Sequence, residues 1–306
     1  MSNSTDIKKS AVGLIRKIIL GLSIIAVIVC AVFLIKSYVI EPYNNRVNNN
    51  DDIDENNTAT SQYGETSDSV QSKYIALLKV NPDFVGKLYV DAIDESGMNV
   101  VQTTDNSKYL TTGFKGETTR YGTIFVDYRN DIKNFNDNTI IYGHNMRDGS
   151  QLGSLSLYSD IENYKLFPTV KFNTIYGNYT WKIFAAFIIN SEPEDDNGYV
   201  FPYLTTKFPS DASFNDFIAD VKNRSYYTNE SVDINSNDKI LTLSTCDTVF
   251  DDARFVLMAR LVRDGESETV DVSKAVVNEN QKFPQAWYDA EGKTNPFRNA
   301  EQYHVD

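Results

Sequence analysis

Cysteine and histidine are scarce in this chain of 306 residues, which contains two of each. Two cysteines cannot build a disulfide scaffold or a four-cysteine zinc site. Chemistry that depends on histidine can use only His144 or His304. Glycine and proline, at 15 and 8 residues, are too few for a collagen-like or proline-rich chain.

Basic residues are outnumbered by acidic ones, and the formal net charge is −13. Nucleic-acid binding needs a basic surface, so a nucleic-acid partner is not expected. The charge is also uneven, because residues 1–36 carry +4 and the remaining 270 residues carry −17. A hydrophobic content of 41% excludes a wholly disordered chain.

The basic N-terminus is followed by an uncharged apolar run of 18 residues, 18–35. As a helix this run spans about 27 Å, close to the ~30 Å of a membrane's hydrocarbon core. A buried core helix and a cleavable signal peptide are the alternatives, but no small-residue cleavage site follows Ile35. We predict a cytoplasmic segment at 1–17 and a single transmembrane anchor at 18–40. The positive-inside rule then places the rest of the chain outside the cell membrane.

The exported part divides by composition into three segments. Residues 41–72 are rich in asparagine and acidic residues and predict a flexible spacer. Residues 73–263 carry the regular apolar patterns of a folded domain, which begins with a short amphipathic helix ending near Asn81. Residues 264–306 form a tail with an acidic start and later aromatic residues, and both a disordered tail and one that docks on the domain remain open.

The folded domain is dominated by strand-like runs rich in Val, Ile, Phe, Tyr and Thr, most of them separated by turn residues. One further helix is indicated at 213–224, where apolar residues follow helical spacing and Ser213 is the expected N-cap. About eight strands with few helices predict a mainly β fold, a closed or nearly closed β-barrel. The expected strands are 85–90, 98–102, 123–128, 139–142, 170–176, 179–190, 240–245 and 254–263.

Cys246 stands at the end of one predicted strand and has no intrachain partner outside the membrane. Arg254 opens the next predicted strand. If the two strands form an antiparallel hairpin, Cys246 and Arg254 lie at the same end of it. His144 follows the run 139–142 and is the only histidine of the predicted barrel.

These three residue types together describe acyl transfer through a thioester. A thiolate is a strong nucleophile, and a nearby imidazole or cation increases its reactive fraction. The imidazole can then protonate a leaving amine, and a guanidinium can bind a developing oxyanion. Taken singly, each residue is more typical of a structural role: Cys246 of a buried structural thiol, His144 of a hydrogen-bonded strand-end residue and Arg254 of a surface charge. The acidic residues after Cys246 are interpreted as loop solvation and not as a metal site.

The string Thr242–Cys246, TLSTC, resembles the T-L-x-T-C signature of sortases, the membrane-anchored cysteine transpeptidases of Gram-positive bacteria. The stretch 138–155 is similar to class B sortases in particular, as are the helices ahead of the barrel and before the cysteine strand. The resemblance covers roughly residues 73–263. It implies a closed barrel of about eight strands, with Cys246 as nucleophile, His144 as acid/base and Arg254 as the donor to the substrate carbonyl.

The resemblance also implies a reaction and its partners. The thiolate would cleave a C-terminal sorting signal of a secreted protein after its threonine and form a thioacyl intermediate. An amine of a peptidoglycan precursor or cross-bridge, or a pilin lysine, would resolve that intermediate. Neither a metal nor an organic cofactor is expected. A hydrolytic cysteine peptidase and a non-enzymatic surface binding module are the alternative functions.

Further residues are implied to contact the sorting signal: Asn106, Leu110 and Ser244 along a groove, and Tyr199 and Val200 in a covering loop. The tail 264–306 departs from the class B pattern, which ends soon after the last strand. Residues 44–84 lack the Asp-Pro-aromatic tripeptide of polymerising class C sortases, which argues against that class without excluding a role in pilus assembly.

Overall fold

The computed structural model describes residue 30 and residues 69–305. The predicted segments 1–17 and 18–40, and the spacer up to residue 68, therefore lie outside the described residues except for Cys30, which is helical and exposed. Within the part of the chain that is described, no helix has the length and apolar character needed to cross a membrane. Everything below concerns residues 69–305.

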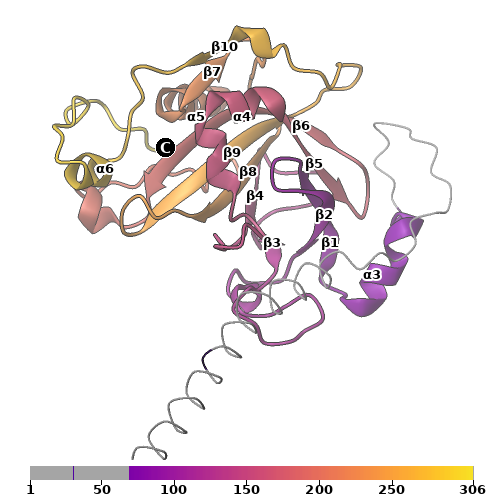
Figure 1. The fold of residues 1–306 in the computed structure, drawn as a ribbon. Coiled ribbons are helices and arrows are strands. Elements are labelled where there is room, and N and C mark those ends of the chain that lie inside the picture. Colours follow the sequence, from indigo (N-terminus) through magenta and orange to yellow (C-terminus); the bar gives the residue numbers. More distant parts are fainter. Residues whose placement is uncertain (1–29, 31–68, 306) are drawn as a thin grey trace, which may run out of the picture. The chain divides into compact units, whose positions relative to one another are not determined.

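Eight strands close into a barrel in the order β1-β2-β3-β4-β8-β9-β6-β5 (Figure 1). Most neighbours are antiparallel, whereas β2–β3 and β4–β8 are parallel. The predicted closed barrel of eight strands is confirmed, and each expected strand is present with ends shifted by a few residues. The strands are β1 (Phe84–Val90), β2 (Asp94–Val101), β3 (Ile124–Val126), β4 (Asn138–Tyr142), β5 (Thr169–Thr174), β6 (Thr180–Asn190), β8 (Ile240–Cys246) and β9 (Ala253–Leu261).

Alternation along β8 and β9 separates the barrel interior from its outer face. Leu241 and Leu243 belong to the interior cluster, together with Leu257 of β9. Val256 and Met258 of β9 belong to a second cluster outside the barrel. Because side chains alternate along a strand, the other face of β8, which carries Thr242, Ser244 and Cys246, lies on the outside. The thiol of Cys246 is thus on the outer surface of the barrel.

The helix α5 (Asp211–Arg224) covers this outer cluster with Phe214, Phe217 and Val221. Its N-cap is Ser210, whose hydroxyl accepts a hydrogen bond from Ser213 N at 3.2 Å, and not the predicted Ser213. The apolar spacing starts only at Phe214, so the prediction placed the start of the helix three residues too late. Within residues 69–305 the other helices are α3 (Ile75–Val80), α4 (Ile161–Leu166) and α6 (Gln285–Ala290), and short 3-10 turns lie at Ser72–Tyr74, Lys108–Leu110, Leu155–Ser159, Pro193–Asp196 and Val272–Lys274.

The tail after residue 263 packs on the barrel domain, which decides between the two alternatives left open by its composition. Its strand β10 (Ala275–Val277) pairs antiparallel with β7 (Tyr227–Asn229) in a separate two-stranded sheet (Figure 1). Nearer the C-terminus, the ring of Tyr303 packs against Phe201 and Phe217, and its hydroxyl donates to Ser213 O at 3.1 Å. The tail therefore reaches back to α5 and to the loop that precedes it.

Candidate active site

Cys246 is on β8, which lies between β9, the strand of Arg254, and β4, the strand that precedes His144. The antiparallel register of β8 and β9 sets Cys246 directly opposite Arg254, so the expected hairpin is present. On the other side, the parallel register of β4 and β8 sets Tyr142 opposite Ser244, and Gly143 N continues the ladder to Ser244 O. His144 follows two residues after the end of β4 and lines the same cleft as Cys246. The thiol is exposed at this end of β8.

The loop that carries His144 is tightly folded and has a buried anchor. Gln151 accepts a hydrogen bond from His144 N at 3.0 Å through its side-chain oxygen, and its amide nitrogen donates to Tyr121 O. Leu152 N also donates to His144 O at 3.2 Å. At Gly143 a Cβ would lie 2.7 Å from Leu152 Cγ, so only glycine fits directly before the histidine. These contacts fix the backbone from which the imidazole projects.

The imidazole of His144 is oriented by a carbonyl group. Its Nε2 lies 2.7 Å from Leu110 O. A carbonyl oxygen can only accept a hydrogen bond, so Nε2 carries the proton in this contact. In the neutral ring, Nδ1 is then the nitrogen that is free to take up a proton.

His144, Cys246 and Arg254 line one cleft of about 390 Å³ together with the predicted groove residues Asn106, Leu110 and Ser244. Asn106 and Leu110 lie in the loop between β2 and β3, so chain segments far apart in sequence meet here. The Arg254 guanidinium donates to the neighbouring Ala253 O at 3.0 Å. The other residues that line the cleft are Tyr109, Thr123, Phe125, Tyr142, Gly143, Gln151, Ser191, Tyr203, Leu204 and Thr245.

Comparisons with known proteins show the family of this chain. The sequence profile described as the Sortase domain matches residues 88–262, more than half of the chain. The chain belongs to the sortase family. It is 36% identical over 253 residues to Sortase B of Listeria monocytogenes, which covers 80% of this chain and 98% of the relative. Sortase B of Staphylococcus aureus is 31% identical over 198 residues, covering 63% of this chain and 76% of the relative.

Solved sortase B structures share the fold. The sortase B of Bacillus anthracis in complex with AAEK2 has a TM-score of 0.62 and 33% identity, and the match covers 72% of this chain and 97% of that one. A Staphylococcus aureus sortase B–substrate complex has a TM-score of 0.57 and 30% identity, with 64% and 87% covered. The prediction of a class B sortase is confirmed, and this family membership assigns the chain to the cysteine transpeptidases of the sortase type.

Two predicted substrate residues of this sortase, Tyr199 and Val200, do not line the cleft. Tyr199 is buried in the outer cluster, where its hydroxyl donates to Tyr303 O at 2.9 Å and its ring packs against His304. The same loop contributes Tyr203 and Leu204 to the cleft instead. No motif pointed to these two residues, because the loop between β6 and α5 has no periodic pattern and its path depends on contacts with the tail and α5.

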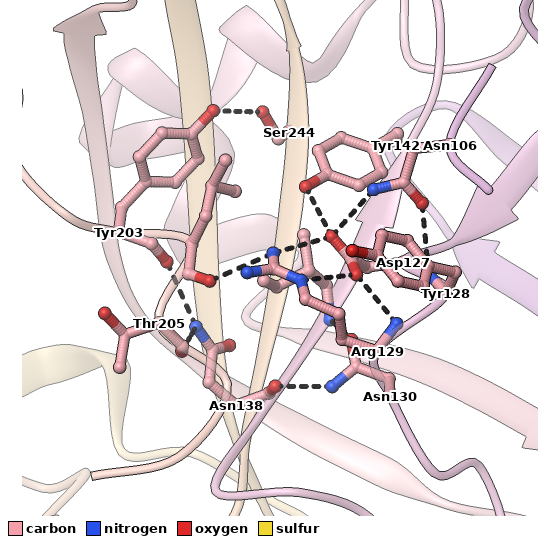
Figure 2. A network of polar contacts seen from close by, with 12 residues as sticks. Asn106, Asp127, Tyr128, Arg129, Asn130, Asn138, Tyr142, Tyr203, Thr205 and Ser244 are labelled. Carbon is pink, nitrogen blue, oxygen red and sulfur yellow. Dashed lines mark hydrogen bonds and ion pairs between the residues drawn. The ribbon is translucent and has the colours of Figure 1, made fainter. Parts of the chain in front are cut away.

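Tyr203 joins the loop to the strand of the thiol. Its hydroxyl lies 3.1 Å from Ser244 Oγ, as Figure 2 shows. Burial raises the pKa of Tyr203, so its hydroxyl stays protonated and neutral at physiological pH. The side chain of Ser244, which lies two residues before Cys246, is therefore hydrogen-bonded to Tyr203, another residue of the cleft lining.

Proposed function

We propose that this sortase uses Cys246 as the nucleophile of a transpeptidation, with His144 as acid/base and Arg254 as the donor to the substrate carbonyl. The observation that carries the proposal is an exposed thiol on β8 with Arg254 opposite it on β9 and His144 just after β4, the strand on the other side of β8. The shared cleft supports it, because a peptide lying there is within reach of all three side chains.

In the first step the thiol of Cys246 transfers its proton to His144, and the sulfur bonds to the carbonyl carbon of the scissile peptide. The developing oxyanion accepts a hydrogen bond from the Arg254 guanidinium. The carbon–nitrogen bond then breaks, and the leaving amine takes the proton from His144. A thioester links the substrate to Cys246.

In the second step an amine attacks the thioester. It forms a new amide bond and gives its proton to His144, while the carbon–sulfur bond breaks and Cys246 recovers the proton. Water in place of the amine gives hydrolysis. The hydrolytic peptidase therefore shares the intermediate and differs only in the acceptor.

The proposed substrates are secreted proteins with a C-terminal sorting signal, whose residues contact Asn106, Leu110 and Ser244. The proposed acceptor is an amine of a peptidoglycan precursor or cross-bridge. Structures described as a sortase B–substrate complex and as sortase B complexed with triglycine exist for relatives, and they support a peptide and an amine of this kind. We also propose that residues 18–40 anchor the chain in the cell membrane with the catalytic domain outside, an expectation that rests on the sequence.

The test is a screen of sorting-signal peptides with the soluble domain, with and without an added glycine peptide. Transpeptidation predicts that the amine is incorporated and that the ligated product rises with amine concentration at the expense of the hydrolysed one. A hydrolysed product whose yield is unaffected by amine would support the peptidase instead. Turnover by Cys246→Ala equal to that of the native enzyme would overturn both.

A further inference from the structure

Beside the cleft lies a buried carboxylate that has no place in the proposed chemistry. Asp127 directly follows β3, and its side chain is fully buried. Burying a charge is unfavourable unless hydrogen bonds and an opposite charge compensate it. The partners of Asp127 therefore show what this carboxylate holds in place.

Asp127 is at the centre of the network in Figure 2. Arg129 forms a two-pronged ion pair with it, Nε to Oδ1 and Nη2 to Oδ2, both at 2.8 Å. The Oδ2 atom also accepts from Tyr142 OH at 2.9 Å and from Asn106 Nδ2 at 3.0 Å. Burial by itself would raise the pKa of Asp127, but these hydrogen bonds outweigh it and the pKa is lowered. The side chain of Asp127 is therefore ionised, and both of its oxygens accept hydrogen bonds.

The partners of Asp127 are parts of the cleft wall. Asn106 comes from the loop after β2 and Tyr142 from the end of β4, and both line the cleft. Arg129 also donates to Leu204 O at 3.2 Å, so it reaches the loop after β6. One carboxylate thus connects three chain segments that surround the proposed peptide site.

The network also fixes the orientation of the Asn106 amide. A carboxylate can only accept, so Nδ2 must face Asp127, while Oδ1 accepts from Tyr128 N at 3.0 Å. With both ends engaged, the amide cannot flip. Its second N–H remains as a donor in a set direction.

We propose that Asp127 is a positioning residue that sets the shape of the peptide cleft and holds Asn106 as a hydrogen-bond donor to the sorting peptide. This inference rests on the proposed function, since it takes the cleft to be the site of that peptide. Asp127 acts through Asn106, Tyr142 and Arg129 and does not touch the reacting atoms.

Asp127→Asn tests this with little change in shape. It replaces one carboxylate oxygen, which accepts hydrogen bonds, by an NH2 group that faces the donors of Arg129, Tyr142 or Asn106. The Asn106 amide then loses its fixed orientation. Arg129 is held less firmly, so its hydrogen bond to Leu204 O weakens. We expect the KM for the sorting peptide to rise about tenfold, with kcat within about twofold. The rate of alkylation of Cys246 by iodoacetamide should be unchanged, because that small reagent needs no groove.

A matched control exists at the opposite end of β8. Asp238 is also buried and also held by a two-pronged arginine, with Arg263 Nε and Nη2 each 2.7 Å from its oxygens. Asp238→Asn breaks the same kind of ion pair away from the cleft. We expect it to lower the melting temperature and to leave the KM for the peptide unchanged, which separates positioning from general destabilisation.

A double-mutant cycle with Asn106→Ala completes the test. If Asp127 acts through Asn106, adding Asp127→Asn to Asn106→Ala should raise the KM by less than about threefold. If Asp127→Asn does not fold, Arg129→Lys is tested in its place. A lysine cannot form the two-pronged ion pair with Asp127 together with the hydrogen bond to Leu204 O, so we expect the KM for the peptide to rise about threefold.

The outcomes separate this inference from the proposed function. An active native chain with an unchanged KM in Asp127→Asn, or in Arg129→Lys where it stands in, overturns the positioning role, and so does an equal rise in Asp238→Asn. A native chain that turns over no sorting peptide overturns the proposed function and this inference with it.

Discussion

At the scale of single residues, Arg254 provides a separate test of the proposed chemistry. Its guanidinium lies opposite Cys246 in the strand register and lines the cleft. Removing one donor to an oxyanion typically lowers kcat by about 10²–10³. We expect Arg254→Ala to show this loss in kcat with a smaller change in KM, measured by steady-state transpeptidation.

Arg254→Lys keeps the charge but loses the planar fork, so we expect it to recover only part of the rate. A lysine variant as active as the native enzyme would show that charge alone is needed. An alanine variant with native kcat would remove Arg254 from the mechanism.

Gln151 tests how the histidine loop is held. Its backbone has a φ of 54°, in the left-handed region, and its side chain bridges His144 N and Tyr121 O. Both Gln151→Ala and Gln151→Gly delete this bridge, but only alanine keeps the strain of a Cβ at positive φ, which costs about 1 kcal/mol. We expect the glycine variant to be at least as stable in urea denaturation as the alanine variant, the reverse of the usual order. Greater stability of Gln151→Ala would contradict this explanation.

The three proposed catalytic residues could be predicted because each stands at the end of a strand-like run, where pairing brings strand ends together. Asp127, Tyr203 and Leu204 could not, because their positions depend on loops whose partners are distant in sequence. Tyr199 shows the limit of a resemblance: it lies in the expected loop, and the tail holds its side chain away from the cleft.

At the scale of elements, the eight barrel strands were predictable because alternation and β-branched residues extend over five or more residues in most of them. The strands β7 and β10 have three residues each, too few for a pattern, and their pairing is decided by the path of the tail. The helices α4 and α6 have six residues each, which is too short for a helical spacing of apolar residues to stand out in the sequence.

The docked tail leads to a prediction about the loop it covers. Tyr303 packs on Phe201 and Phe217, and its backbone carbonyl accepts from Tyr199 OH. Because Tyr303→Ala removes the ring, we expect faster amide hydrogen exchange in residues 196–204 and a stability lower by about 1–3 kcal/mol. Tyr303→Phe keeps the ring and loses only the hydroxyl contacts with Ser213, so its exchange should stay near the native rate. Unchanged exchange in Tyr303→Ala would mean that the tail does not hold this loop.

At the scale of the whole molecule, a buried cluster ties the end of the barrel to the start of the tail. Glu266 forms ion pairs with Arg260 and Lys182, each at 2.6 Å, and Arg260 is fully buried. Glu266→Gln leaves two buried cations without their counter-charge. Breaking such a pair from one side typically costs about 3–5 kcal/mol, and we expect a loss of that size in chemical denaturation.

The same cluster makes a prediction about acid stability. The hydrogen bonds from Arg260 hold the pKa of Glu266 far below its ordinary value of 4.5. As the pH falls below 4.5, Glu266 therefore takes up a proton in the unfolded chain while it stays ionised in the folded chain. The contribution of Glu266 to the free energy of unfolding is therefore fully present above pH 4.5 and decreases as the pH falls below 4.5. The stability difference between the native chain and Glu266→Gln should be constant from pH 6 to 8 and shrink below about pH 4.5. A difference that grows towards acid pH would have the wrong sign.

The proposed chemistry requires that Cys246 carries the substrate as a thioester, which intact-mass spectrometry of the enzyme with a sorting-signal peptide and no amine can detect. We expect a mass increase equal to the acyl part of the peptide, absent in Cys246→Ala and discharged when a glycine peptide is added. A native enzyme that cleaves the peptide without ever gaining that mass, or an equal adduct on Cys246→Ala, would contradict it.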